Sequence, residues 1–221
     1  MVAAGSGSRL GAPVPKALVE LDGVPLVRRC VDNLAVAGVG FVVVTIPAGC
    51  EAEFALALDG ADARVTCVVG GSRRQDSVAI GLRALAGLPG ESLVLVHDAA
   101  RPFVPAEAVH RVLQALLDGA VAVVPTLAVV DSIRQSCAGG STVVDRSALR
   151  AVQTPQGFRL GDLARAHDHI NRSGIEVTDD AAACEALGLP VVLVDGHRHA
   201  FKITEPFDML LAGAILAAEG T

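Results

Sequence analysis

The chain has 221 residues, of which 52% are hydrophobic, and its formal net charge is −6 at pH 7. This length suits a single α/β domain with a large apolar core, and the acidic balance argues against a nucleic-acid surface, which needs a basic face. The five cysteines are scattered and no apolar run approaches the ~20 residues of a membrane span, so we expect a cytoplasmic protein with reduced thiols, no membrane contact and no signal peptide.

The chain opens with a loop of glycines and small residues, Ala3-Ala4-Gly5-Ser6-Gly7-Ser8-Arg9-Leu10, and Pro15-Lys16 follows shortly afterwards. Glycines let the backbone curl so that successive N–H groups point into one concavity, which binds anions. Arg9 and Lys16 add two cations, which suit a triphosphate and the charge that builds up during displacement at phosphorus. The loop therefore predicts nucleotide chemistry. The alternative is a flexible Gly/Ser loop without a ligand.

The spacing of this loop excludes two common nucleotide motifs. No Gly-x4-Gly-Lys-Ser/Thr string occurs, and the glycines from Gly5 to Gly11 read GxGxxxG rather than the dinucleotide fingerprint GxGxxG. The strand predicted over residues 41–46 also lacks a terminal acidic residue that could hold a ribose. A nicotinamide-dependent oxidoreductase is therefore disfavoured.

Strands alternate with helices along most of the chain. Apolar residues at helical spacing predict a first helix over residues 26–34, and Gly38 suits its C-terminal cap. Continuous β-branched runs predict strands that are covered on both faces. The later predicted elements are a strand over 41–46, a helix near 52–58, a strand over 64–69, a helix near 77–85, a strand over 93–96, a helix near 106–117 and a strand over 121–125. Repeated βα units predict a Rossmann-like, three-layer α/β fold with a mostly parallel sheet.

The alternation breaks at about residues 126–146. Two extended segments, 127–134 and 142–144, flank the turn sequence Ala138-Gly139-Gly140-Ser141, which predicts a β-hairpin arm. Such an arm has to cover its edges, and docking on a second copy of the chain is one way. Beyond it we expect helices near 160–171, from Thr178 and from Glu205, and a strand over 191–195.

Three polar clusters follow predicted strands, at the edge where ligands bind in α/β folds. Residues 70–77, Gly-Gly-Ser-Arg-Arg-Gln-Asp-Ser, offer backbone donors, a hydroxyl and two guanidinium groups. Residues 96–102, Val-His-Asp-Ala-Ala-Arg-Pro, place Asp98 to hold Mg²⁺ or a ribose and Arg101 to meet a phosphate. Lys202 lies at a strand end. Taken alone, these features would be a tight turn, an Asp–Arg ion pair and a solvated lysine.

Together, the ordered motifs resemble the 2-C-methyl-D-erythritol 4-phosphate cytidylyltransferase family of the non-mevalonate isoprenoid pathway. The motifs are Ala-Ala-Gly-x-Gly-x-Arg with Pro-Lys, Gly-Gly-x-x-Arg-x-x-Ser, Val-His-Asp-Ala-Ala-Arg-Pro, Asp-Arg, Gln-Thr-Pro-Gln, Thr-Asp-Asp and Phe-Lys-Ile-Thr. The resemblance spans essentially the whole chain. The first motif is shared with many sugar nucleotidyltransferases, whereas the ordered set is more specific.

The resemblance implies a role for each motif. Stabilisation of the transition state falls to residues matching Arg9, Lys16 and Lys202. The nucleotide site matches Ala3, Ala4, Gly5, Gly7, Gly71, Arg74, Ser77 and Asp98, with Asp98 also near the metal. The sugar phosphate is held by residues matching Arg101, Thr178 and Lys202, and by Ser132 and Arg146 from the arm of a partner subunit. Ser132 stands where the family has threonine and keeps the hydroxyl.

The implied reaction transfers CMP from CTP to 2-C-methyl-D-erythritol 4-phosphate, with Mg²⁺ as cofactor and a homodimer as the working assembly. Because the attacking phosphate is already an anion, it needs no general base, and His97 is expected to be structural. Alternatives are a ribitol-5-phosphate cytidylyltransferase and a non-catalytic nucleotide-binding regulator. Transition-state cations at Arg9, Lys16 and Lys202 argue against the regulator.

One departure from the family concerns the start of the chain. The resemblance implies a full hydrophobic strand ahead of the glycine loop, whereas only Met1 and Val2 precede Ala3. We expect the true start to lie upstream of the recorded one, and we expect restored upstream residues to raise the melting temperature and the activity.

Overall fold

The central sheet of the computed structural model, which describes residues 1–5, 7 and 10–219, is mixed. Its strand order is β11 (Val191–Asp195), β6 (Ala122–Ala128), β10 (Gln156–Arg159) and β5 (Leu93–Val96), with β9 (Arg150–Val152) also pairing with β6. A separate parallel pair contains β3 (Phe41–Ile46) and β4 (Arg64–Val69).

Most strands run in one direction. β11 is parallel to β6, and β10 is antiparallel to both β6 and β5. Val2 forms parallel bridges to Thr45 in β3 and to Asp98 just after β5, which aligns the two parts. The expected α/β fold with a mostly parallel sheet is therefore confirmed, with β10 as an antiparallel insertion that the sequence analysis did not predict.

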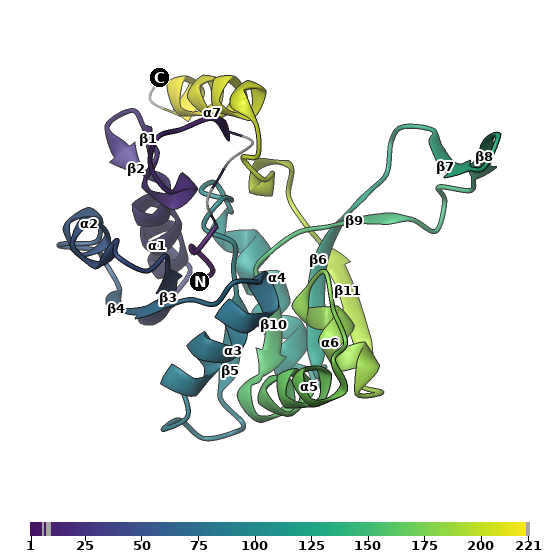
Figure 1. The fold of residues 1–221 in the computed structure, drawn as a ribbon, viewed down its shortest axis with the longest axis horizontal. Coiled ribbons are helices and arrows are strands. Elements are labelled where there is room, and N and C mark those ends of the chain that lie inside the picture. Colours follow the sequence, from purple (N-terminus) through teal and green to yellow (C-terminus); the bar gives the residue numbers. More distant parts are fainter. Residues whose placement is uncertain (6, 8–9, 220–221) are drawn as a thin grey trace.

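Helices cover both faces of this arrangement (Figure 1). On one face lie α1 (Leu26–Val36), α2 (Glu51–Ala57) and α4 (Ala106–Leu117), and on the other lie α3 (Arg74–Ala84), α5 (Leu160–Ser173) and α6 (Asp180–Ala186). Alternate strand residues serve the two faces, because successive side chains of a strand point in opposite directions. The result is the expected three-layer arrangement.

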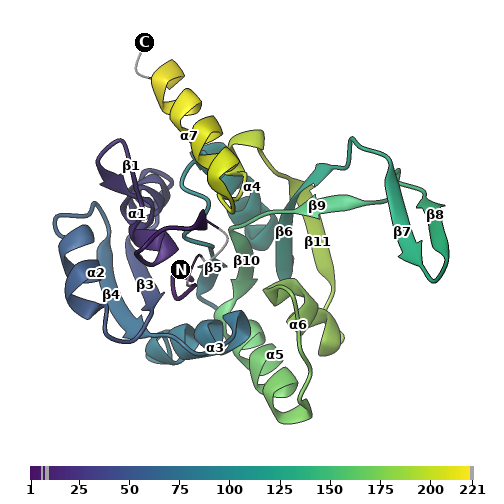
Figure 2. The same cartoon turned by 45° about the horizontal axis from the view of Figure 1, so that its top comes forward.

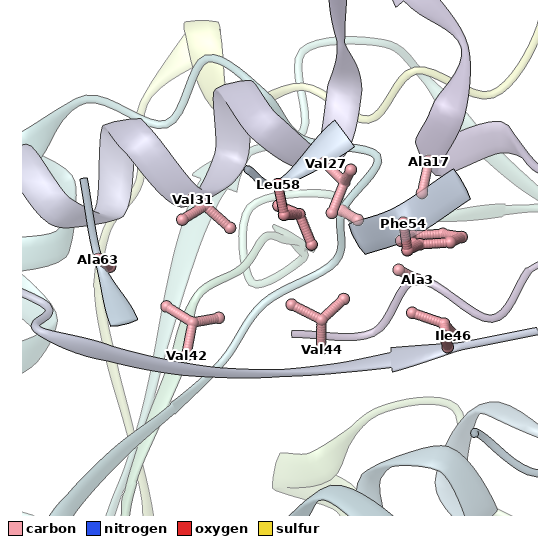
Figure 3. Close-up of a cluster of buried hydrophobic side chains, with 11 residues drawn as sticks. Ala3, Ala17, Val27, Val31, Val42, Val44, Ile46, Phe54, Leu58 and Ala63 are labelled. Atoms are coloured by element: carbon pink, nitrogen blue, oxygen red, sulfur yellow. The ribbon is translucent and has the colours of Figure 1, made fainter. Parts of the chain in front are cut away.

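The packing between α1 and β3 illustrates how the sequence pattern builds a layer. Val27 and Val31 of α1 face Val42 and Val44 of β3, and Phe54 of α2 closes the cluster (Figure 3). These side chains are 0–5% exposed. Burial of each stabilises the fold by roughly 1.5–3 kcal/mol relative to exposure.

An apolar cavity of about 340 Å³ separates β3 from β5. Its walls include Phe41 and Val43 from β3 and Leu93 and Leu95 from β5, and Met1 and Val2 lie at one end. Within the described part of the chain, no strand pairs with β3 and β5 along this cavity beyond the bridges of Val2. The cavity therefore lies where the resemblance placed a strand ahead of the glycine loop.

The predicted hairpin is present. β7 (Ile133–Cys137) pairs antiparallel with β8 (Gly140–Val144), and Gly139 in the turn has φ 83°. The two strands project away from the rest of the molecule (Figures 1 and 2). The segment expected to be extended from Leu127 to Arg134 is interrupted, because β6 ends at Ala128 and β7 begins at Ile133.

Short elements complete the chain. A 3-10 turn, η2 (Lys16–Leu18), leads to the small antiparallel pair β1 (Glu20–Leu21) and β2 (Val24–Pro25). Near the other end lie η3 (Arg198–Ala200) and α7 (Pro206–Glu219), and α7 packs over β1 (Figure 1). All five cysteines are unpaired. None of the helices described here has both the length and the apolar character needed to cross a membrane.

Candidate active site

A second cavity, of about 310 Å³, opens beyond the ends of β4 and β5, where ligands bind in α/β folds. It collects four separate segments of the chain: the first loop, the turn between β4 and α3, the segment after β5, and the segment before α7. Ten of the residues predicted from sequence line it: Ala3, Ala4, Gly5, Gly7, Lys16, Gly71, Arg74, Ser77, Asp98 and Lys202. Arg9 lies outside the described residues.

The first loop brings Lys16 to the cavity. Gly7 has φ 67°, and a Cβ built there would lie 2.6 Å from the Cβ of Lys16, so both the backbone angle and the space require glycine. The Lys16 ammonium donates a hydrogen bond to the carbonyl oxygen of Ile203 at 3.0 Å. Lys16 and Lys202, from opposite ends of the chain, therefore converge on one cavity.

The turn between β4 and α3 forms another part of the wall of the cavity. The Gly71 N–H donates to Oγ of Ser77 at 3.1 Å, which fixes the turn against the first helical turn of α3. A Cβ at Gly70 would lie 2.8 Å from the Cβ of Ala4, and one at Gly71 would lie 2.4 Å from the Cβ of Asp76. Gly70 thus lets this turn approach the first loop closely, and Gly71 lets it pack against the start of α3.

Asp98 connects the cations of the cavity. Its Oδ2 lies 2.7 Å from the Lys202 ammonium, and its Oδ1 accepts from Nε of Arg74 at 3.1 Å. Burial alone would raise the pKa of Asp98, but the charges of Arg74 and Lys202 hold it well below its usual value. Asp98 is therefore ionised at neutral pH.

Arg74 is held from a second side by a residue that the sequence analysis did not assign. Its Nη1 lies 2.7 Å from Oδ2 of Asp180, whose other oxygen lies 3.0 Å from Nε2 of His167. Burial lowers the pKa of Arg74, but Asp180 and Asp98 outweigh that effect and raise it. The Thr-Asp-Asp motif contains Asp180, yet only its threonine was given a role from sequence. His167 stood in no motif.

His97 is 1% exposed and both of its ring nitrogens have partners. Nδ1 lies 3.0 Å from Oγ1 of Thr154, and Nε2 lies 3.1 Å from the carbonyl oxygen of Arg101. Burial lowers the pKa of His97 to about 4, so the ring is neutral at pH 7. These contacts agree with the expected structural role.

The residues expected to hold a sugar phosphate are spread more widely. Arg101 comes directly after the lining residue Ala100 in the sequence. Its guanidinium donates hydrogen bonds to the carbonyl oxygens of Ala200 (2.6 Å) and Val152 (3.3 Å). Thr178 is exposed, two residues before Asp180. None of Arg101, Thr178, Ser132 and Arg146 is among the lining residues of the cavity.

Ser132 and Arg146 belong to the arm. Both are exposed, and Arg146 donates a hydrogen bond to the carbonyl oxygen of Val130 within the arm. They flank β7 and β8, which Figure 2 shows extending away from the body of the same chain. The chain alone does not bring these two side chains to the cavity.

The described residues provide few metal ligands. Asp98 is the one acidic side chain among the described lining residues, and no cluster of three or more His, Cys, Asp or Glu suited to a metal occurs in the described part. Mg²⁺ in nucleotide enzymes is commonly held by one or two carboxylates together with water and substrate phosphates. A single carboxylate beside a glycine-rich loop fits that mode of binding.

The chain matches, over residues 1–218, the model of a family described as 2-C-methyl-D-erythritol 4-phosphate cytidylyltransferase. A protein of that name from Streptomyces avermitilis is 46% identical over 228 residues, covering 97% of this chain and 89% of that protein. One from Saccharopolyspora erythraea is also 46% identical and covers 97% and 96%. The crystal structure of the enzyme of that name from Thermus thermophilus superposes with a TM-score of 0.81 at 40% identity, covering 97% of this chain and 96% of that one.

Proposed function

The chain belongs to the 2-C-methyl-D-erythritol 4-phosphate cytidylyltransferase family and is a nucleotidyltransferase, and from this premise we propose how its residues share the reaction. The reaction transfers CMP from CTP to 2-C-methyl-D-erythritol 4-phosphate and yields 4-diphosphocytidyl-2-C-methyl-D-erythritol and pyrophosphate. The whole chain acts as one domain in this proposal. Its unpaired cysteines agree with a reducing, cytoplasmic location.

The convergence of Lys16 and Lys202 on one cavity carries this proposal. A phosphate oxygen of the acceptor attacks the α-phosphorus of CTP, and the bond from that phosphorus to the bridging oxygen of pyrophosphate breaks. Both reactants are polyanions, so the protein has to position them and neutralise their charge rather than form a covalent intermediate. Lys16, Lys202 and Arg9 are the cations that we assign to this task.

The nucleotide takes the first loop and the turn between β4 and α3. Backbone N–H groups around Gly5 and Gly7 face the triphosphate, and Gly71, Arg74 and Ser77 face the cytosine and ribose. Ala3 and Ala4 line the same wall. Asp98 orients Arg74 and Lys202 through its two oxygens.

Mg²⁺ fits beside Asp98, and when bound it supplies positive charge to the phosphate oxygens of the leaving pyrophosphate. Asp98 would be its nearest carboxylate, directly or through water. The remaining ligands would come from the nucleotide and from water.

The acceptor phosphate takes Arg101, Thr178 and Lys202 from one chain, and Ser132 and Arg146 from the arm of a second. The support for a swapped arm is geometric. Both arm residues are exposed and lie on a hairpin that leaves its own body. The working assembly is therefore proposed to be a homodimer.

Pyrophosphate release tests the proposal. The protein is incubated with CTP, Mg²⁺ and either 2-C-methyl-D-erythritol 4-phosphate or ribitol 5-phosphate, and UTP replaces CTP in a parallel series. We expect pyrophosphate with CTP and the methylerythritol phosphate only. Release with ribitol phosphate instead would assign the polyol substrate, and CTP binding without any release would indicate a regulator.

A further inference from the structure

Asp180 is a buried carboxylate that does not line the nucleotide cavity, yet it forms an ion pair with a residue that does. It is 1% exposed, and its Oδ2 lies 2.7 Å from Nη1 of Arg74. An ionised side chain at this depth is costly unless it is paired and its position is fixed. Its partners therefore indicate what it does.

The backbone around Asp180 is fixed from β10. Oε1 of Gln156 accepts from the N–H of Asp180 and from the N–H of Ala181, both at 3.1 Å. Nε2 of Gln156 donates to Oδ2 of Asp179 at 3.0 Å, and Oδ1 of Asp179 accepts from the N–H of Ala182 at 2.9 Å. Gln156 is 0% exposed. These hydrogen bonds thus hold in place the backbone that carries the Asp180 side chain.

The side chain of Asp180 is also fixed. His167, itself 1% exposed, places Nε2 3.0 Å from Oδ1 of Asp180, which leaves Oδ2 for Arg74. Arg74 in turn uses a different nitrogen, Nε, toward Asp98. Carboxylates at two different nitrogens of one guanidinium, a hydrogen bond at Nε and an ion pair at Nη1, restrict where it can lie.

We propose that Asp180 is a positioning residue for nucleotide binding, which holds the guanidinium of Arg74 at the cavity wall and acts on CTP only through Arg74. The proposal rests on the nucleotide-binding role proposed for Arg74. Without Asp180, Asp98 is the one ion-pair partner that Arg74 keeps among the described residues, and it is shared with Lys202. The guanidinium then has more than one orientation, and CTP binding loses its pre-arranged partner.

The neighbouring carboxylate provides a matched control. Asp179 lies one residue earlier and contacts Gln156 and the start of α6; the hydrogen bonds of its carboxylate do not involve Arg74. Asp179→Asn removes one negative charge from the same turn and keeps an N-cap side chain. Because Asp179→Asn disturbs the hydrogen bond from Gln156 but removes no contact of Arg74, we expect it to raise the KM for CTP severalfold less than Asp180→Asn does.

The test compares KM and kcat for Asp180→Asn with those of the control. We expect the KM for CTP to rise about ten- to hundredfold, because Arg74 loses one of its two charged partners, with a much smaller change in kcat. Direct titration of CTP by calorimetry gives the same comparison without turnover. A wild-type KM in folded Asp180→Asn protein would overturn the proposal.

A double variant separates positioning from general damage and remains usable if Asp180→Asn does not fold, since it removes both charges of the pair. In an Arg74→Gln background, Asp180→Asn is expected to change the KM for CTP by less than about twofold, because its route to the nucleotide is already lost. An equally large rise in that background would show that Asp180 does not act through Arg74. If wild-type protein neither binds CTP nor releases pyrophosphate, the proposed function fails instead.

Discussion

Gly7 and Lys16 form a contact that ties the conformation of the first loop to the position of a proposed catalytic cation. The Cα and Cβ atoms of Lys16 fill the space that a side chain at position 7 would need. Gly11 in the same loop has a similar φ of 70°, but none of the described residues has an atom within 4 Å of a Cβ built there. Substitutions at Gly7 and Gly11 therefore distinguish the effect of backbone strain from the effect of displacing Lys16.

Gly7→Ala is expected to lower kcat by about 10²–10³, the cost of misplacing one preorganised charge contact. Gly11→Ala carries the same type of φ penalty without the steric contact, and we expect its kcat to stay within a fewfold of wild type. Steady-state pyrophosphate release measures both. Equal losses in the two variants would mean that loop strain, rather than the position of Lys16, limits the reaction.

His97 predicts a pH dependence of stability. Because burial lowers its pKa from 6.5 to about 4, the unfolded chain binds a proton that the folded chain refuses. The contribution of His97 to the free energy of unfolding is therefore fully present above about pH 6.5 and is lost as the pH falls toward 4. The expected loss between pH 7 and pH 5 is about 2 kcal/mol.

Denaturant unfolding of wild type and His97→Asn at the two pH values measures this loss. We expect a smaller difference between the pH values in the variant. The contribution of Asp98 lies lower, because its depressed pKa adds stability that is lost only below about pH 4. An unchanged pH difference in His97→Asn would assign the effect to other groups.

The residues of the cavity differ in how visible they were from sequence. Arg74, Asp98 and Lys202 stood in motifs at predicted strand ends and Lys16 followed the first loop, and the family resemblance implied that all four share one site. Asp180 was adjacent to a predicted residue, but its pairing with Arg74 depends on where β10 places the start of α6. Such a contact is set by tertiary packing, which no local spacing encodes.

At the scale of elements, strands with continuous β-branched runs were predicted with close bounds, as for β3 and β4. β10 was missed because its four residues contain glutamine, glycine and arginine and only one apolar side chain. Its place depends on Gly157, where a Cβ would lie 2.4 Å from Cγ1 of Val112 in α4. The absence of a side chain there, rather than a strand propensity, lets β10 enter the sheet.

The cavity between β3 and β5 predicts the effect of adding a strand. Val2 is in register with Thr45 and Asp98, so four or five residues ahead of it would extend the ladder to Phe41 and Leu93. An added segment of β-branched apolar residues before Met1 is expected to fill the cavity and pair with both edges. Since each buried apolar side chain contributes roughly 1.5–3 kcal/mol, the melting temperature should rise by at least about 5 °C.

Thermal unfolding of the extended protein gives the measurement. An extension of equal length made of glycine and serine is the control, because it supplies backbone without apolar side chains. We expect activity to rise with the apolar extension, since the first loop follows directly from this position. Equal melting temperatures for the two extensions would contradict the prediction.

At the scale of the whole molecule, the arm decides whether the site is complete in one chain. If Ser132 and Arg146 act in the cavity of the partner, Lys16→Ala inactivates the cavity of its own chain. Arg146→Ala inactivates the cavity of the partner chain. In a mixed dimer, one cavity receives both intact components. Mixing the two inactive proteins is therefore expected to restore up to about a quarter of wild-type activity, since half of the dimers are mixed and each has one intact site.

Subunit exchange has to be shown independently of activity. Cys137 is exposed at the end of β7 and accepts a fluorophore, so energy transfer between differently labelled chains reports mixed dimers. Cys137→Ser is the control for labelling at the other cysteines. Mixed dimers that form and stay inactive would contradict the shared site.

Because the arm extends away from its own chain, the activity of the proposed dimer depends on the protein concentration. Dilution would dissociate the dimer and remove the partner's arm from each acceptor site. The nucleotide cavity, which one chain forms by itself, would remain intact. In the dilute range the total reaction rate would then vary with the square of the protein concentration, so the rate per chain would fall in proportion to dilution. The affinity of each chain for CTP would not change.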